Sequence, residues 1–233
     1  MRYIYLLLIL CCLSCNNERI LQLPELKNTE ITEVLDISPA HIFYDDTQAD
    51  STLLNRKNLI ISTNWLVNVD KRLTLRQAIP HIKFLQDKKR NAEMHKNEDA
   101  KNYFTCNDTS IDSLGFLEFT DLNYEIINIE KEAIALHAAK QNNSNDTISE
   151  NSIRSVYLVI DNQNKNDFES ETIKTLELIK NSIPLYENIK ITGFSFAIYL
   201  DKDLSFQDYI SIKSKLLAID TEKVIIEANE FIY

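Results

Sequence analysis

Few residues in this chain have the type and spacing that suggest chemistry. The candidates are four histidines, one cysteine beyond the first fifteen residues, and two aspartates that each follow an apolar run: His41, His81, His95, His137, Cys106, Asp70 and Asp201. Histidine metal ligands commonly lie a few residues apart on one element. These histidines are widely separated in the sequence, so we expect no metal site and no catalytic histidine.

Cys106 is followed by Asn107 and Asp108 at the end of an apolar stretch. A thiol nucleophile needs a stabilised thiolate, whereas a lone cysteine at a strand end is usually buried. Asp70 and Asp201 could act as paired carboxylates, but aspartate also favours the turns that follow strands. The chain has only 2 glycines, which excludes glycine-rich phosphate and dinucleotide loops. We therefore predict no catalytic residue and no cofactor. A small envelope hydrolase or thiol enzyme that uses Cys106 is the alternative.

The two aspartates belong to two similar stretches, residues 60–85 and residues 194–216, and each has the pattern of strand, tight turn and helix. Aligning them pairs Asp70 and Lys71 with Asp201 and Lys202, Leu73 with Leu204, Thr74 with Ser205, Leu75 with Phe206, Ile79 with Ile210 and Leu85 with Leu216. Apolar residues at spacing two predict a strand with one buried face. The capping pairs Thr74/Gln77 and Ser205/Asp208 then predict helix starts. The pattern indicates a duplicated strand-turn-helix unit, with ordinary α/β turn chemistry as the alternative.

Two residues interrupt the helical patterns. Pro80 would be the sixth residue of the first helix, where proline costs about 3 kcal/mol. We therefore expect a kink there, or a helix that begins near Ile79. Lys213 falls on the apolar face of the second helix, and we expect its ammonium group to reach outward to solvent.

The first fifteen residues have the pattern of a bacterial secretion signal. Arg2 precedes an apolar run at 4–13, which is too short to span a bilayer, and Ser14-Cys15 follows. Leu13-Ser14-Cys15 resembles the lipobox of bacterial lipoproteins, with Cys12 in the place of the usual aliphatic residue. We predict that residues 1–14 are a signal peptide and that Cys15 is lipidated. A plain signal peptide or a short retained anchor is the alternative.

Composition is consistent with an envelope protein. The net charge of −10 excludes nucleic acid as an expected partner, because such binding needs clustered cations. Loss of Cys11 and Cys12 with the signal, and acylation of Cys15, would leave Cys106 without a disulfide partner. We expect a protein in the bacterial cell envelope that faces the periplasm or the cell surface, held to the membrane by its lipid, with an envelope protein or itself as partner.

The polarity of the chain suggests its organisation. We expect a tether at 15–38, a first α/β subdomain at 39–140, a polar linker at 141–152 and a second α/β subdomain at 153–233. Further strands are expected at 41–44 (an edge strand), 103–106, 114–119, 155–160 and 223–227, and further helices at 125–140 and 168–183. This order predicts the α/β (α+β) class, as a two-layer sandwich of a small mixed sheet with helices on one face.

Residues 155–227 resemble the periplasmic domain of the ExbD/TolR family of biopolymer transport proteins. The resemblance rests on Ala197-Ile198-Tyr199-Leu200-Asp201-Lys202 followed by a helix near Phe206, with Leu200 in place of a small residue. Members of that family carry a membrane carboxylate that couples to proton flow, whereas residues 1–15 here contain no Asp or Glu. The resemblance therefore implies a protein that contacts envelope partners and is not the proton-coupled part of a motor.

We thus expect a non-enzymatic, lipid-anchored envelope protein with a protein-binding domain, an accessory of biopolymer transport. An exposed sheet edge is a common docking site for a partner strand. The candidate edge comprises Val224, Ile225, Ile226, Phe231, Ile232 and Tyr233, with core packing as the alternative. A carrier of a small hydrophobic ligand between the two layers is a further alternative function.

Overall fold

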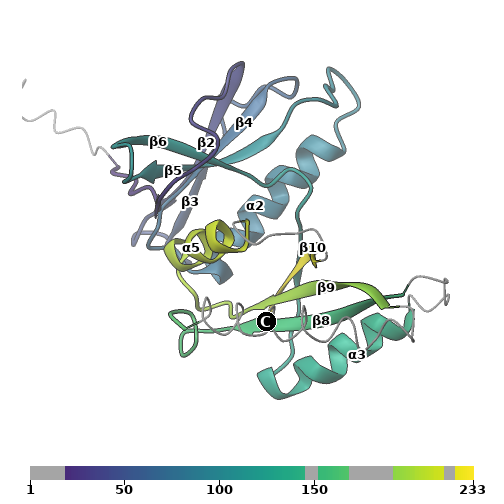
Figure 1. The fold of residues 1–233 in the computed structure, drawn as a ribbon. Coiled ribbons are helices and arrows are strands. Elements are labelled where there is room, and N and C mark those ends of the chain that lie inside the picture. Colours follow the sequence, from purple (N-terminus) through teal and green to yellow (C-terminus); the bar gives the residue numbers. More distant parts are fainter. Residues whose placement is uncertain (1–18, 145–151, 168–190, 218–223) are drawn as a thin grey trace, which may run out of the picture.

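The structure is a computed structural model that describes residues 19–144, 152–167, 191–217 and 224–233 (Figure 1). The elements, in chain order, are β1 (Glu25–Leu26), β2 (Ile37–Tyr44), β3 (Thr52–Asn55), β4 (Asn64–Val69), α2 (Leu75–Arg90), β5 (Asn102–Asp108), β6 (Ser113–Glu118), β7 (Asn123–Ile126), η1 (Lys131–Ala133), α3 (Ile134–Ser144), β8 (Ser152–Ile160), β9 (Ile191–Leu200), α5 (Phe206–Leu217) and β10 (Val224–Ile232). The protein is therefore of the predicted α+β class. The helix expected at 168–183 and the lipidation site Cys15 lie outside the described residues.

The first sheet has the strand order β1-β5-β4-β2-β3, and β6 pairs with β5 in addition. Strands β2, β4 and β5 run parallel to one another, while β3 and β6 are antiparallel additions. The prediction of an edge strand at 41–44 is wrong, because β2 lies between β4 and β3. The expected tether also contributes, since β1 pairs with the end of β5.

The second sheet has the order β7-β10-β9-β8, and all its strands are parallel. The strand order β10-β9-β8 repeats the order β5-β4-β2 of the first sheet. The change from one sheet to the other falls between Glu118 and Asn123, ahead of the expected linker at 141–152. Residues 141–144 continue α3 instead.

A single helix over 125–140 is wrong, because the start of this range pairs with another strand. Asn123–Ile126 forms β7 alongside β10, and α3 begins only at Ile134. Ile126, the last residue of β7, is exposed. Strand β7 pairs through its backbone with β10, which lies much later in the chain, and such a pairing produces no pattern in the local sequence.

Helix α2 begins at Leu75, as the capping pair predicts. The Thr74 amide donates to Gln77 Oε1 at 2.9 Å, and Pro80 lies inside the helix. Burying a large aliphatic side chain is worth about 1.5–3 kcal/mol. The buried stripe that includes Ile79, Ile82 and Leu85 therefore outweighs the cost of Pro80, and the helix neither ends nor restarts there.

Helices α2 and α5 lie between the two sheets (Figure 1), and one continuous core joins all four. Phe104 of β5 stacks on Phe119 at 3.8 Å between ring centroids and meets Phe206 of α5 edge-on at 5.2 Å. Helix α3 packs on the opposite face of the second sheet, against Tyr199 and Phe231. Each sheet thus has one helix on its inner face. We call the first sheet with α2 the first unit, and the second sheet with α5 and α3 the second unit; α2 and α5 face each other where the two units meet.

Candidate functional site

The two strand-turn-helix corners, Asp70–Arg76 and Asp201–Gln207, pair with each other. Thr74 and Ser205 form an antiparallel bridge. Four backbone bonds surround it: Leu75 N to Leu204 O (2.9 Å), Phe206 N to Leu73 O (2.7 Å), Arg76 N to Lys202 O (2.8 Å) and Gln207 N to Lys71 O (3.2 Å). Each bond has its counterpart when Asp70 is aligned with Asp201. The residues that the sequence alignment equates are therefore related by an approximate two-fold axis at this contact.

Both predicted aspartates serve their own turns. Asp70 accepts hydrogen bonds from the Arg72 amide at 3.1 Å and the Arg72 Nε at 2.8 Å, and it also accepts one from the Gln22 amide. Burial alone would raise the pKa of Asp70, but these hydrogen bonds and the Arg72 charge hold it below the usual range. Asp201 accepts the Asp203 amide at 2.8 Å. These contacts assign both carboxylates to turn formation, and Asp70 in addition holds the N-terminal segment at Gln22.

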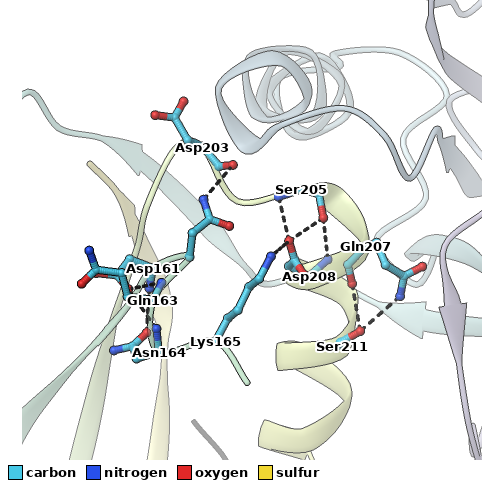
Figure 2. A network of polar contacts seen from close by, with 10 residues as sticks. Asp161, Gln163, Asn164, Lys165, Asp203, Ser205, Gln207, Asp208 and Ser211 are labelled. Atoms are coloured by element: carbon cyan, nitrogen blue, oxygen red, sulfur yellow. Dashed lines mark hydrogen bonds and ion pairs between the residues drawn. The ribbon is translucent and has the colours of Figure 1, made fainter. Parts of the chain in front are cut away.

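The start of α5 is closed by a capping box and an ion pair (Figure 2). Ser205 donates through its amide and hydroxyl to Asp208, and the Asp208 amide donates back to Ser205 Oγ at 3.1 Å. Lys165 reaches from the loop after β8 and donates to Asp208 Oδ2 at 2.8 Å. Burial raises the pKa of Asp208, but Lys165 and Ser205 lower it by more. The helix start is thereby fixed to that loop.

The same loop begins at Asp161, at the carboxyl end of β8. Its Oδ1 accepts the amides of Gln163 (2.8 Å) and Asn164 (3.1 Å), and Lys131 forms an ion pair with Oδ2. Ligands of open α/β sheets bind outside the carboxyl ends of the strands. Here the carboxylates Asp70, Asp161 and Asp208 hold loops and helix starts. In the described part of the chain, no group of three His, Cys, Asp or Glu residues could hold a metal ion.

The remaining candidates for chemistry, apart from His95, are also engaged or buried. Burial raises the pKa of the Cys106 thiol to about 12, so the thiol is neutral at physiological pH. His81 Nε2 lies 3.0 Å from the Thr52 hydroxyl, and His137 Nδ1 lies 2.9 Å from the Tyr199 hydroxyl. His41 stacks on Phe43, and His95 is exposed.

The predicted partner-binding edge divides into two parts. Phe231, Ile232 and Tyr233 are buried, because β10 lies between β9 and β7. Val224–Ile226 pairs with β9, but β7 begins its pairing only at Asn229. Among the described residues no strand covers the other side of 224–226, and the Ile225 side chain is 51% exposed.

A buried polar network was not anticipated. Lys213 Nζ donates to Glu230 Oε1 at 2.5 Å, and the Tyr209 hydroxyl donates to Glu230 Oε2 at 2.9 Å. The Tyr209 hydroxyl also lies 2.9 Å from that of Tyr124, and burial raises the pKa of both tyrosines well above the usual range. The expectation that Lys213 reaches solvent is wrong, because Glu230 accepts it inside the core. The one sequence signal was a lysine on an otherwise apolar helix face.

Irregular pairing positions Glu230. The register of β10 against β9 shifts between Ile226 and Glu230. Such bulges re-aim the side chains that follow them. Glu230 thus points toward Tyr209 and Lys213 on α5.

No family model matches the chain, and the curated proteins and solved structures contain no significant match to it. Over the described residues, no helix combines the length and apolarity needed to cross a membrane.

Proposed function

We propose that this is a non-enzymatic, lipid-anchored protein of the bacterial cell envelope, whose paired α/β units bind a protein partner as an accessory of biopolymer transport. The observation that carries the proposal is the pairing of the two corners. The backbone groups at the start of each central helix bond to the other corner, and the nearby carboxylates bond to their own turns and loops. Because these groups are already bonded within the molecule, we expect the two units to act as one rigid body that binds its partner through its outer surface.

The lipid anchor is supported by the sequence of residues 1–15 alone. We expect radiolabelled palmitate to be incorporated into the protein in cells, and Cys15→Ser to abolish the label. Incorporation into Cys15→Ser would refute lipidation at this residue. Residues 1–18 lie outside the described part of the chain.

The partner is tested by crosslinking in intact cells, with a photoreactive residue at Ile225 and, as a matched control, at Ile60. Both residues are exposed, but Ile60 lies in the segment between β3 and β4 of the first unit and not in the second sheet. We expect a discrete adduct from Ile225 only, and mass spectrometry should identify a component of a proton channel or an outer-membrane receptor. Equal labelling at both sites, or no adduct at all, would contradict a partner contact at this edge.

Two other functions are supported less well. A thiol enzyme would need an accessible thiolate, and Cys106 is fully buried with a raised pKa. A hydrophobic-ligand carrier would need space between the layers. Phe104, Phe119, Phe206 and Tyr209 fill the described part of that region with direct ring contacts. A lipid or other small molecule that copurifies in native mass spectrometry would favour the carrier.

A further inference from the structure

The arm segment Gln22–Leu26 crosses from the first unit to the second. In the first unit, the Lys71 amide donates to Gln22 O at 2.8 Å. The equivalent amide in the second unit, that of Lys202, donates to Tyr233 O at 3.0 Å. The Gln22 carbonyl of the arm therefore plays the same part at the first corner as the Tyr233 carbonyl plays at the second.

The arm also extends the first sheet. The Asn107 amide donates to Pro24 O at 2.8 Å and the Thr109 amide to Leu26 O at 3.1 Å, as β1 runs parallel to the end of β5. These two amides find their backbone acceptors in the arm. They report directly on whether the arm is in place.

Gln207 of α5 holds the arm from the second unit. The Glu25 amide donates to Gln207 Oε1 at 2.8 Å, and Gln207 Nε2 donates to Glu25 O at 2.9 Å. The side-chain amide thus pairs with both backbone groups of one residue, as a neighbouring strand would. Lys71 forms an exposed ion pair with the Glu25 side chain at 2.6 Å.

Little apolar surface secures the arm. Pro24 and Leu26 are buried, whereas Gln22 and Glu25 are exposed, and β1 is only two residues long. Segments with few buried apolar contacts and exposed backbone bonds open at lower free energy than the core. Strand β4 and residues 195–200 of β9, by contrast, are mostly buried.

We propose that the arm segment Gln22–Leu26 is a releasable clasp, which joins the two units when it is closed and frees the N-terminal arm when it opens. The next contact along the chain is that of Asn28, whose amide donates to Ser110 Oγ at 3.1 Å, and the Thr29 amide then donates to Asp108 Oδ2 at 2.8 Å. Opening therefore frees the chain as far as Lys27 while the rest of the first sheet stays paired.

One consequence rests on the proposed lipid anchor. A fully extended chain spans at most about 3.5 Å per residue, so Cys15 lies within about 25 Å of Gln22. When the clasp opens together with the ion pair between Arg19 and Asp45 (3.2 Å), the first fixed point moves to Asn28 and this reach extends to about 45 Å. Palmitate labelling tests the anchor and amide exchange tests the clasp, so failure of one is distinguishable from failure of the other.

The test is amide hydrogen exchange in the full chain by NMR. In the wild type, the Asn107 and Thr109 amides should exchange faster than those of Asp70 and Asp201, which donate to the sheet carbonyls of Ile42 and Ile160. Gln207→Ala should accelerate Asn107 and Thr109 about tenfold or more, because two hydrogen bonds are lost, and leave Asp70 and Asp201 unchanged.

Arg76→Ala is the matched control. Arg76 also contacts the other unit, through Asp203 at 2.7 Å, but does not contact the arm. It should leave the exchange of Asn107 and Thr109 at the wild-type rate. The proposal is overturned if these two amides exchange only as slowly as Asp70 and Asp201 in the wild type, or if Gln207→Ala and Arg76→Ala have the same effect.

Discussion

Removing one partner of the buried Lys213–Glu230 ion pair should cost far more than removing an exposed one. The two side chains are 6% and 0% exposed, and the Tyr209 hydroxyl supplies the other carboxylate oxygen with a donor. Breaking such a pair by replacing one member typically costs about 3–5 kcal/mol, because a charge is left buried without compensation. We expect Glu230→Gln to fall near the lower end, since the amide oxygen can still accept from Tyr209.

The double variant Glu230→Gln with Lys213→Met separates the lost charge pairing from lost packing. Replacing both members of a buried pair with residues of similar volume is often neutral. We therefore expect the double variant to recover most of the stability that Glu230→Gln loses. Glu118→Gln is the exposed control, because its partner Lys101 is 50% exposed and such pairs contribute about 0–1 kcal/mol.

Urea unfolding followed by tryptophan fluorescence provides the measurement. The chain has 1 tryptophan, Trp65, and it is fully buried in the core. The reasoning is refuted if Glu230→Gln lowers the free energy of unfolding by less than about 1 kcal/mol, or if the double variant is less stable than Glu230→Gln alone and Lys213→Met alone.

Three further results are expected. Gly115→Ala should destabilise the protein by about 1–3 kcal/mol in urea unfolding, because a Cβ there would lie 2.5 Å from Thr29 Cγ2; Thr29→Ser in the same background should restore part of the loss. Burial lowers the pKa of Lys89 to about 8, so the unfolded state holds its proton to higher pH and the free energy of unfolding should rise between about pH 8 and 10. Trp65, whose ring lies 5.1 Å from Lys89 Nζ, should report the titration by fluorescence. An equal rise of the free energy of unfolding with pH in Lys89→Met would count against this. Cys106 should react with a thiol reagent at neutral pH only after unfolding, so rapid labelling of the native protein would contradict its burial.

Local sequence patterns predicted the elements whose partners lie nearby in sequence. Alternating apolar residues in β9 and the capping residues of α2 and α5 each express a local rule, and the structure contains them. The contact between the two corners was not predictable in this way. Leu75 and Leu204 pair through backbone groups, which every residue type except proline carries, so the alignment equated the two corners without indicating that they meet.

The same limit explains the errors in the site. Lys213 looked solvent-directed because a lysine on an apolar stripe usually is, and Glu230 becomes its partner through an irregular register far along the chain. The arm looked like a tether because it is polar. Its contacts use the backbone of Glu25 and one glutamine side chain, and neither produces a periodic pattern.

The pairing of the corners also governs how the chain can acquire its structure. Leu73 O finds its donor, and Leu75 N its acceptor, only in residues 204–206, and Arg76 and Asp203 are separated by 127 positions. Contacts of such long range slow folding, because the intervening loop must close before they form. The first unit therefore remains incomplete until nearly the whole chain is available for folding. We expect the two units to reach the native state together, in one cooperative step.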